Sequence, residues 1–170
     1  MKFKNYFFAA AMAAALCGCA EQKPANPLFS DFTAPFGIAP FEEITIDHFR
    51  EGMLKGLEEQ KKDVEAILNN TEAPTFENTI KALDQSGVLL RKVRGTFGPL
   101  SSGSATDETR ALQKEMSPIF SAHNDDIYLN PALFAKVKAV YDNKENLTFA
   151  PGVQTALRYT HGWLAEGGGP

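Results

Sequence analysis

The sequence lacks cysteine beyond its first nineteen residues, which limits how the rest of the chain can be held together. Its two cysteines, Cys17 and Cys19, lie close to the N-terminus, so the remainder must fold by packing alone. Runs of lysine and arginine are also missing and the formal net charge is −4, which argues against a nucleic-acid-binding surface. The basic pairs at residues 61–62 and 91–92 sit among acidic residues and are interpreted as solvated helix faces.

Motifs that carry known chemistries are missing as well. None of the three histidines, His48, His123 and His161, is part of the zinc motif H-E-x-x-H. There is no G-x-S-x-G nucleophile elbow, no Walker phosphate loop and no C-x-x-C pair in the sequence. The three glycines at 167–169 lack the strand and helix that surround a nucleotide-binding loop. The sequence therefore predicts no catalytic residue, no cofactor-binding residue and no metal ligand.

The first nineteen residues have the pattern of a lipoprotein signal peptide. A basic start precedes an apolar run over residues 6–16, which is too short for a comfortable membrane span. The sequence L-C-G-C at 16–19 resembles the lipobox of bacterial lipoproteins, and we predict Cys19 as the lipidated residue because the small Gly18 precedes it. The alternatives are an ordinary secretory signal or a disulfide with Cys17, although that disulfide would close a small, strained loop.

This pattern predicts a signal peptide at 1–19, a polar tether at 20–26 and one domain at 27–170. A chain of 170 residues that is 44% hydrophobic is long and apolar enough for one domain with a core. Thirteen phenylalanines and four tyrosines exclude an intrinsically disordered chain. We expect the domain to lie in the bacterial cell envelope, held to a membrane by its lipid on the periplasmic or the outer surface.

The hydrophobic pattern of the domain predicts an all-α array of about five helices, preceded by an extended segment rich in proline and phenylalanine. That segment covers residues 27–44, and we expect its phenylalanines and prolines to fill surface grooves. Beyond it, apolar residues recur at spacings of three, four and seven, which is the pattern of amphipathic helices. The predicted helices cover residues 45–70, 75–97, 107–127, 130–142 and a stretch from about Pro151 that carries Leu157 and Leu164.

Local signals predict where these helices begin and where they are interrupted. Gly87 is a weak point within the second helix, and the Gly-, Pro- and Ser-rich residues 98–107 are predicted to form a loop. Pro118 is expected to kink or break the third helix. The predicted N-caps are Asp47, Thr75 with Asn78 three residues on, Thr106 or Asp107, and Asn130 followed by Pro131.

Residues 123–126, His-Asn-Asp-Asp, are the most suggestive candidate site. His123 follows apolar residues at helical spacing, where a histidine is usually packed and hydrogen bonded. Asp125 and Asp126 lie at the predicted C-terminus of this helix, where the helix dipole disfavours acidic side chains. We therefore expect them to form a hydrogen bond with the N-terminus of a neighbouring helix. A calcium loop would need further oxygen ligands, which residues 127–129 do not supply. We interpret the stretch as a helix end and connector; the alternative is that its polar groups face a channel and touch peptide.

Four stretches of the chain are similar to one known family. "NPLFSDFTAPFGIAPFEEI", "HFREGMLKGLEEQKKDVEAILNN", "EAPTFENTIKALDQSG" and "SAHNDDIYLNPALFAKVKAVYD" resemble the N-terminal region of the peptidyl-dipeptidase and oligopeptidase A type zinc metallopeptidases, the relatives of thimet oligopeptidase. The resemblance runs from about Asn26 to about Leu147, and "PTFENTI" and "AHNDDIYLNPALF" are its most specific parts. After about Thr148 the family pattern is only faintly echoed.

The resemblance implies the N-terminal part of a longer helical enzyme with two halves around a deep channel. Zinc in such enzymes is held by H-E-x-x-H and a downstream Glu in the other half, so no catalytic or zinc-binding residue is carried over to this chain. The implied partners are an oligopeptide substrate and the missing catalytic half, and the chain alone is expected to be inactive. A frameshift, a premature stop, a split gene or a designed truncation would each explain such a chain.

The alternative is a stand-alone envelope lipoprotein that binds peptides or a partner protein without catalysis. A severed half is expected to leave apolar helix faces uncovered, such as that of Leu133, Val137 and Val140. A self-sufficient module is expected to unfold cooperatively as a soluble monomer.

Overall fold

The computed structural model describes residues 25–144 and 151–165, and within them it is all-α with no strand. The all-α prediction is therefore confirmed for the part of the chain that is described. Two short 3₁₀ turns, Pro27–Phe29 and Pro35–Gly37, precede the helices. The helices are α1 (Ile46–Asn69), the π-helical turn η3 (Phe76–Lys81) with α2 (Ala82–Gln85), α3 (Val88–Gly103), α4 (Asp107–Tyr128), α5 (Pro131–Asp142) and α6 (Pro151–Ala165).

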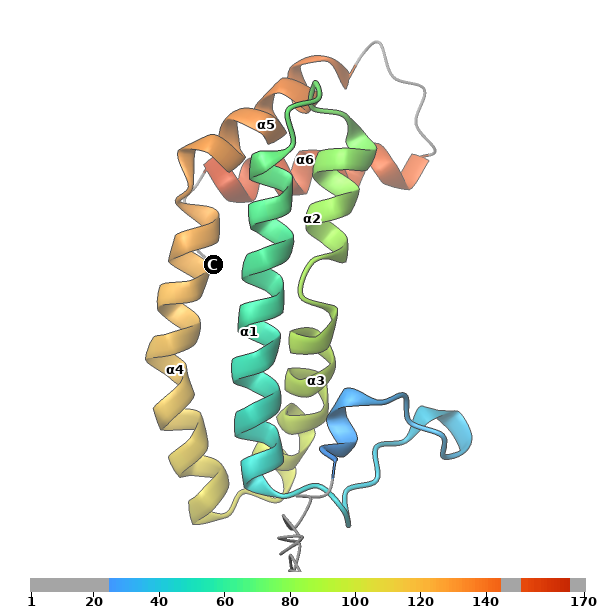
Figure 1. Ribbon diagram of the computed structural model, residues 1–170, viewed down its shortest axis with the longest axis vertical. Helices are drawn as coiled ribbons and strands as arrows, with labels where there is room; N and C mark the ends of the chain where they lie inside the picture. Colours follow the sequence, from blue (N-terminus) through green and yellow to red (C-terminus); the bar gives the residue numbers. More distant parts are fainter. Residues whose placement is uncertain (1–24, 145–150, 166–170) are drawn as a thin grey trace, which may run out of the picture.

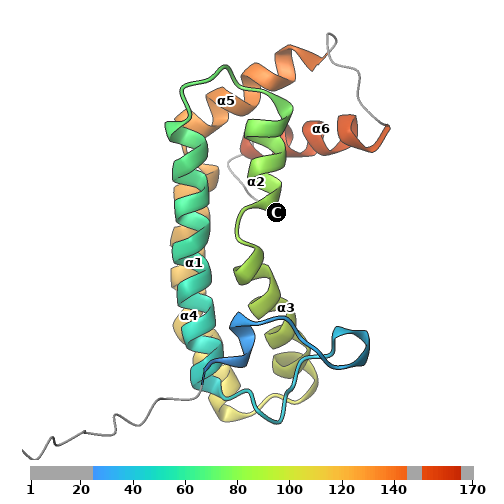
Figure 2. The same ribbon diagram turned by 45° about the vertical axis from the view of Figure 1, so that its right-hand side comes forward.

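Helices α1, α3 and α4 run side by side along the long axis of the molecule, while α5 and α6 lie across one end (Figures 1 and 2). The 3₁₀ segment packs at the opposite end, against α1 and α3. Helices α2 and α3 follow one another along the flank of α1 with a break between them. None of the described helices is both long enough and apolar enough to cross a membrane.

Side chains of threonine and asparagine cap most of these helices. Thr75 and Asn78 form the predicted capping box, and the Asn130 side chain accepts bonds from two backbone N–H groups at the start of α5. Thr106 is the cap of α4. The prediction that Asp47 caps α1 was wrong, because Thr45 is the N-cap and Asp47 lies in the first turn of the helix, paired with Arg50. The threonine is better placed because two hydrogen bonds form a capping box: the His48 N–H donates to the Thr45 hydroxyl oxygen, and the Thr45 N–H donates to the His48 imidazole.

Two predicted interruptions differ from the structure. The loop predicted at 98–107 is wrong in its first part, since α3 continues through Pro99 to Gly103. Leu100 packs on the core, and the hydroxyls of Ser101 and Ser102 bond to the Gly98 carbonyl, which extends the helix. Helix α4 likewise runs from Asp107 to Tyr128 without a break at Pro118.

The apolar side chains form two cores, one at each end of the molecule. The first lies between α1, α3 and α4 around Phe49, which meets Phe97 edge-to-face at 5.2 Å. The second joins α1, η3, α4, α5 and α6, and it buries Leu133, Val137 and Val140 completely or almost so. The expectation that this face of α5 stays uncovered was wrong, because side chains of α1, η3, α4 and α6 cover it.

The N-terminal segment is extended as predicted, but only part of it fills a groove. Leu28 is fully buried in the first core and Phe32 packs against it. Phe36 and Phe41 are exposed, so the expectation that the aromatic residues fill grooves was wrong for them. Asn26 was assigned to the tether, yet it is buried, caps the first 3₁₀ turn and donates to the His48 carbonyl at 2.9 Å. The folded part therefore includes Asn26.

Candidate functional site

The break between α2 and α3 lies beside a hollow in the described part of the molecule. Gly87 adopts the left-handed conformation with φ of 66°, which favours glycine. Its N–H donates to the Asp63 carboxylate at 3.1 Å, and the Ser86 hydroxyl donates to the Leu83 carbonyl at 2.7 Å. A side chain at this position would come within 2.6 Å of the Gln60 amide on α1. The turn is therefore fixed to α1 by glycine-specific packing and by hydrogen bonds.

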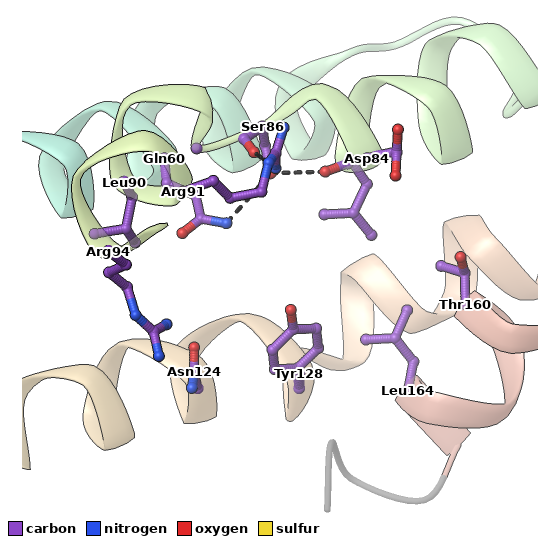
Figure 3. A pocket seen from close by; sticks show the side chains of 12 residues that line it. Gln60, Asp84, Ser86, Leu90, Arg91, Arg94, Asn124, Tyr128, Thr160 and Leu164 are labelled. Carbon is purple, nitrogen blue, oxygen red and sulfur yellow. Dashed lines mark hydrogen bonds between the residues drawn. The ribbon is translucent and has the colours of Figure 1, made fainter. Parts of the chain in front are cut away.

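We name the hollow beside this break the α3–α4 cleft; it has a volume of about 700 Å³. Its walls come from α1, α2, α3, α4 and α6 and from the break itself (Figure 3). Arg91 and Arg94 of α3 lie on one wall, and Asn124 and Tyr128 of α4 lie on the facing wall. The lining also includes Gln60, Leu83, Asp84, Leu90, Thr160 and Leu164.

The electrostatics of the cleft are set by its two arginines. The Arg91 guanidinium donates to the Ser86 carbonyl at 2.5 Å, and the Arg94 guanidinium lies 4.7 Å from the centre of the Phe120 ring. Burial raises the pKa of the Tyr128 phenol, while the charges of both arginines act in the opposite direction. The phenol is therefore a neutral hydrogen-bonding group at pH 7, close to two positive charges.

The predicted stretch at residues 123–126 lies inside the last turns of α4, not in a connector. His123 Nε2 lies 2.9 Å from the Gln60 side-chain oxygen, so the prediction of a packed, hydrogen-bonded histidine is confirmed. Burial lowers its pKa, although the nearby Asp126 opposes this. Asp125 and Asp126 are exposed, and among the described residues neither makes the expected bond to a helix N-terminus. Asn124, by contrast, does line the cleft.

The three histidines are not brought together, and each has a different environment. His48 Nδ1 accepts from the Thr45 N–H at 3.2 Å, and the His161 ring stacks on Tyr141 at 4.1 Å. Across the described ranges, no three His, Cys, Asp or Glu side chains are grouped so that they could hold a metal ion. These residues therefore do not fit the zinc that the family resemblance implies. The predicted lipidation site, Cys19, lies outside the described residues.

Reasoning from the sequence missed the two arginines of the cleft. The pair at 91–92 was interpreted as a solvated helix face, which is confirmed for Arg91 because it is exposed, although it also lines the cleft. Lys92 instead bonds to the Ser30 carbonyl and lies 4.2 Å from the Phe32 ring centre. The available signal was the three-residue spacing of Arg91 and Arg94, which places both on one side of a helix.

Comparison with known proteins shows which proteins this chain is similar to. The chain is 37% identical over 122 residues to the dipeptidyl carboxypeptidase of Salmonella typhimurium (strain LT2) and 35% identical over 122 residues to that of Escherichia coli (strain K12). The chain is related to the dipeptidyl carboxypeptidases. The resemblance predicted from the sequence is therefore confirmed. The similarity covers 72% of this chain but only 18% of either dipeptidyl carboxypeptidase. No family model matches the chain.

Proposed function

We propose that this chain is the N-terminal, non-catalytic helical part of a peptidyl-dipeptidase-like zinc metallopeptidase that hydrolyses short peptides. The observation that supports this most directly is the 35–37% identity to two dipeptidyl carboxypeptidases over 122 residues. In this role the helices form one wall of a peptide channel. Zinc binding and hydrolysis belong to the other part of the enzyme.

The proposal is tested by assaying the purified 170-residue chain on short blocked peptides such as acetyl-tetraalanine. The chain is expected to release no dipeptide, with or without added zinc. The Escherichia coli dipeptidyl carboxypeptidase in the same buffer is the positive control. Release of dipeptides by the chain that stops when a chelator is added would contradict the proposal, because it would place a complete zinc centre in these residues.

A second candidate function is a stand-alone envelope lipoprotein that binds peptides or a partner protein without catalysis. The burial of Leu133, Val137 and Val140 favours it, since this apolar face needs no further domain to cover it. Sedimentation and urea unfolding distinguish the two candidates. A soluble monomer that unfolds in one cooperative transition supports the stand-alone lipoprotein, whereas self-association through exposed apolar surface supports the partial enzyme.

We also propose that Cys19 carries a lipid that anchors the chain in the bacterial envelope. Support comes from the L-C-G-C pattern at 16–19 and the apolar run before it. In cells fed radiolabelled palmitate, the wild-type chain and Cys17→Ala should be labelled, while Cys19→Ala should not. Labelling of Cys19→Ala would place the lipid elsewhere, and an unlabelled wild-type chain would mean that no anchor exists.

A further inference from the structure

We propose that the loop at residues 33–41 inserts into the surface of a neutral phospholipid bilayer, as a second membrane contact beside the lipid at Cys19. We name it the apolar loop, and its inserting side chains are those of Phe36, Ile38 and Phe41. That a bilayer lies within reach rests on the proposed lipidation of Cys19. The exposure of the three side chains is a property of the structure itself.

The first observation is that the apolar loop leaves large side chains exposed. Phe36 is fully exposed, while Ile38 is 57% and Phe41 45% exposed. Single exposed apolar residues are common on protein surfaces, but here three lie within six positions of one loop. Side chains closer to the start of the same segment do pack, since Leu28 is fully buried and Phe32 lies against the first core. Packing within the described fold therefore does not account for the three side chains of the loop.

The second observation is the backbone that presents Phe36. Its φ of 64° lies in the left-handed region, where a bulky residue is strained, and the side chain gains no burial in return. The turn is nevertheless ordered: the Gly37 N–H donates to the Ala34 carbonyl at 3.0 Å, and Pro35 and Pro40 restrict the backbone on either side. A loop that is ordered before binding loses less entropy when it inserts. Burial of Phe36 in lipid would offset the strain.

The third observation is the short connection between the loop and the proposed lipid. Six residues, 20–25, separate Cys19 from Asn26, which is fixed to α1 by its bond to the His48 carbonyl. Fully extended, this connection spans at most about 25 Å. The loop lies at the same end of the molecule as the start of α1 and projects beside α3 (Figures 1 and 2). A lipid at Cys19 would therefore keep the loop close to the bilayer and raise its effective concentration there.

The fourth observation is charge, which selects the kind of bilayer. Residues 30–43 include Asp31, Glu42 and Glu43 and contain no lysine or arginine. Acidic groups beside the inserting side chains are repelled by the negative surface potential of anionic lipids. Phenylalanine and isoleucine side chains, by contrast, enter the boundary between headgroups and acyl chains through their apolar area. The loop therefore fits a neutral phospholipid, such as phosphatidylcholine or phosphatidylethanolamine, better than an anionic one.

Tryptophan fluorescence tests the proposal on the full chain, purified from bacterial membranes and reconstituted into phosphatidylcholine vesicles. Trp163, the single tryptophan of the sequence, is replaced by phenylalanine, and Phe36→Trp then places a reporter in the loop. Phospholipids with brominated acyl chains quench a tryptophan that is in contact with them. Phe36→Trp is expected to lose about half of its emission, because an interfacial side chain buried by about 5–10 Å lies within reach of the bromines.

Leu129→Trp, in the same Trp163→Phe background, is the matched control. Leu129 is also well exposed, at 59%, but it follows α4 at the other end of the molecule (Figure 1). Its emission should not change when the lipid is brominated. Ile38→Trp is a second reporter that leaves the strained turn at Phe36 unaltered. Circular dichroism checks that each variant is folded, and flotation checks that it is attached to the vesicles.

Chains that float while Phe36→Trp and Ile38→Trp stay unquenched overturn the proposal, as do chains that do not float. Blue-shifted emission without quenching would show that protein, either a second copy or a further part of the enzyme, covers the loop instead of lipid. Quenching that appears only after phosphatidylglycerol is added would show attraction of nearby Lys55 and Lys92 to anionic headgroups, and would overturn the assignment to neutral lipid.

Equal quenching of Leu129→Trp would show adsorption of the whole molecule and would overturn the assignment to the loop. Palmitate labelling decides separately whether Cys19 carries a lipid. A labelled chain whose loop reporters stay unquenched counts against insertion of the loop alone, whereas an unlabelled chain counts against the anchor. The two proposals therefore fail separately.

Discussion

Replacing Gly56 with alanine tests the close approach of α1 and α3. A Cβ atom at Gly56 would lie 2.8 Å from both the backbone N and Cα of Leu90, and 3.0 Å from its Cβ. These are backbone atoms of α3, so they cannot rotate away as the end of a side chain would. Helices α1 and α3 would have to move apart, which would loosen the first core around Phe49 and Phe97.

The expected magnitude follows from two opposing terms. Alanine favours a helix interior over glycine by about 1 kcal/mol. Forcing extra volume into a packed contact costs about 1–3 kcal/mol, and the backbone clash places this case at the upper end. The free energy of unfolding of Gly56→Ala should therefore fall by about 1–2 kcal/mol relative to wild type.

Gly95→Ala is the matched control, because Gly95 lies within α3 and an added Cβ there meets nothing within 4 Å. This variant should gain up to about 1 kcal/mol from helix propensity alone. Urea unfolding followed by circular dichroism at 222 nm measures both variants. If Gly56→Ala proves as stable as Gly95→Ala, then the close approach of α1 and α3 is not as the structure has it.

Three further predictions use the same unfolding assay. Gly87→Ala should destabilise the fold by about 1–2 kcal/mol, because φ is positive there and the new Cβ would meet Gln60; unchanged stability would contradict the fixed break between α2 and α3. Asn130→Ala should cost about 1 kcal/mol through loss of the α5 cap, whereas Asn130→Asp should cost far less. Burial lowers the pKa of His123 in the folded protein, so the imidazole binds a proton more readily in the unfolded chain. The contribution of His123 to stability is therefore present above the pKa that it has in the unfolded chain, and it is lost as the pH falls below that value. Wild type should therefore lose more stability than His123→Gln between pH 8 and pH 5, and parallel curves would refute this.

The features that were predicted correctly depend on contacts between near neighbours in sequence. The cap at Thr75 pairs with Asn78, and that at Asn130 uses the next turn of α5, so both are visible as short motifs. The helical spacing of apolar residues likewise identified each long helix. Such signals do not require knowledge of what packs across the molecule.

The features that were missed depend on contacts between distant segments. The break at Gly87 is fixed by Gln60 and Asp63 of α1, so the local sequence showed only a weak point. The face of Leu133 is buried partly by Leu164 of α6, which the pattern within α5 could not reveal. The α3–α4 cleft is also a property of helix packing, because α1, α2 and α6 complete its walls, so spacing alone could not place the arginines in it.

The most direct test of the proposed role exchanges this chain for the matching part of a known enzyme. In the Escherichia coli dipeptidyl carboxypeptidase, the 122 residues that align with this chain are replaced by their counterparts from this chain. We predict that the chimera releases dipeptides from short peptides, while the same enzyme with those residues deleted does not. A chimera that is folded and binds zinc but releases no dipeptide would contradict the proposal that these helices serve as the non-catalytic part of such a peptidase.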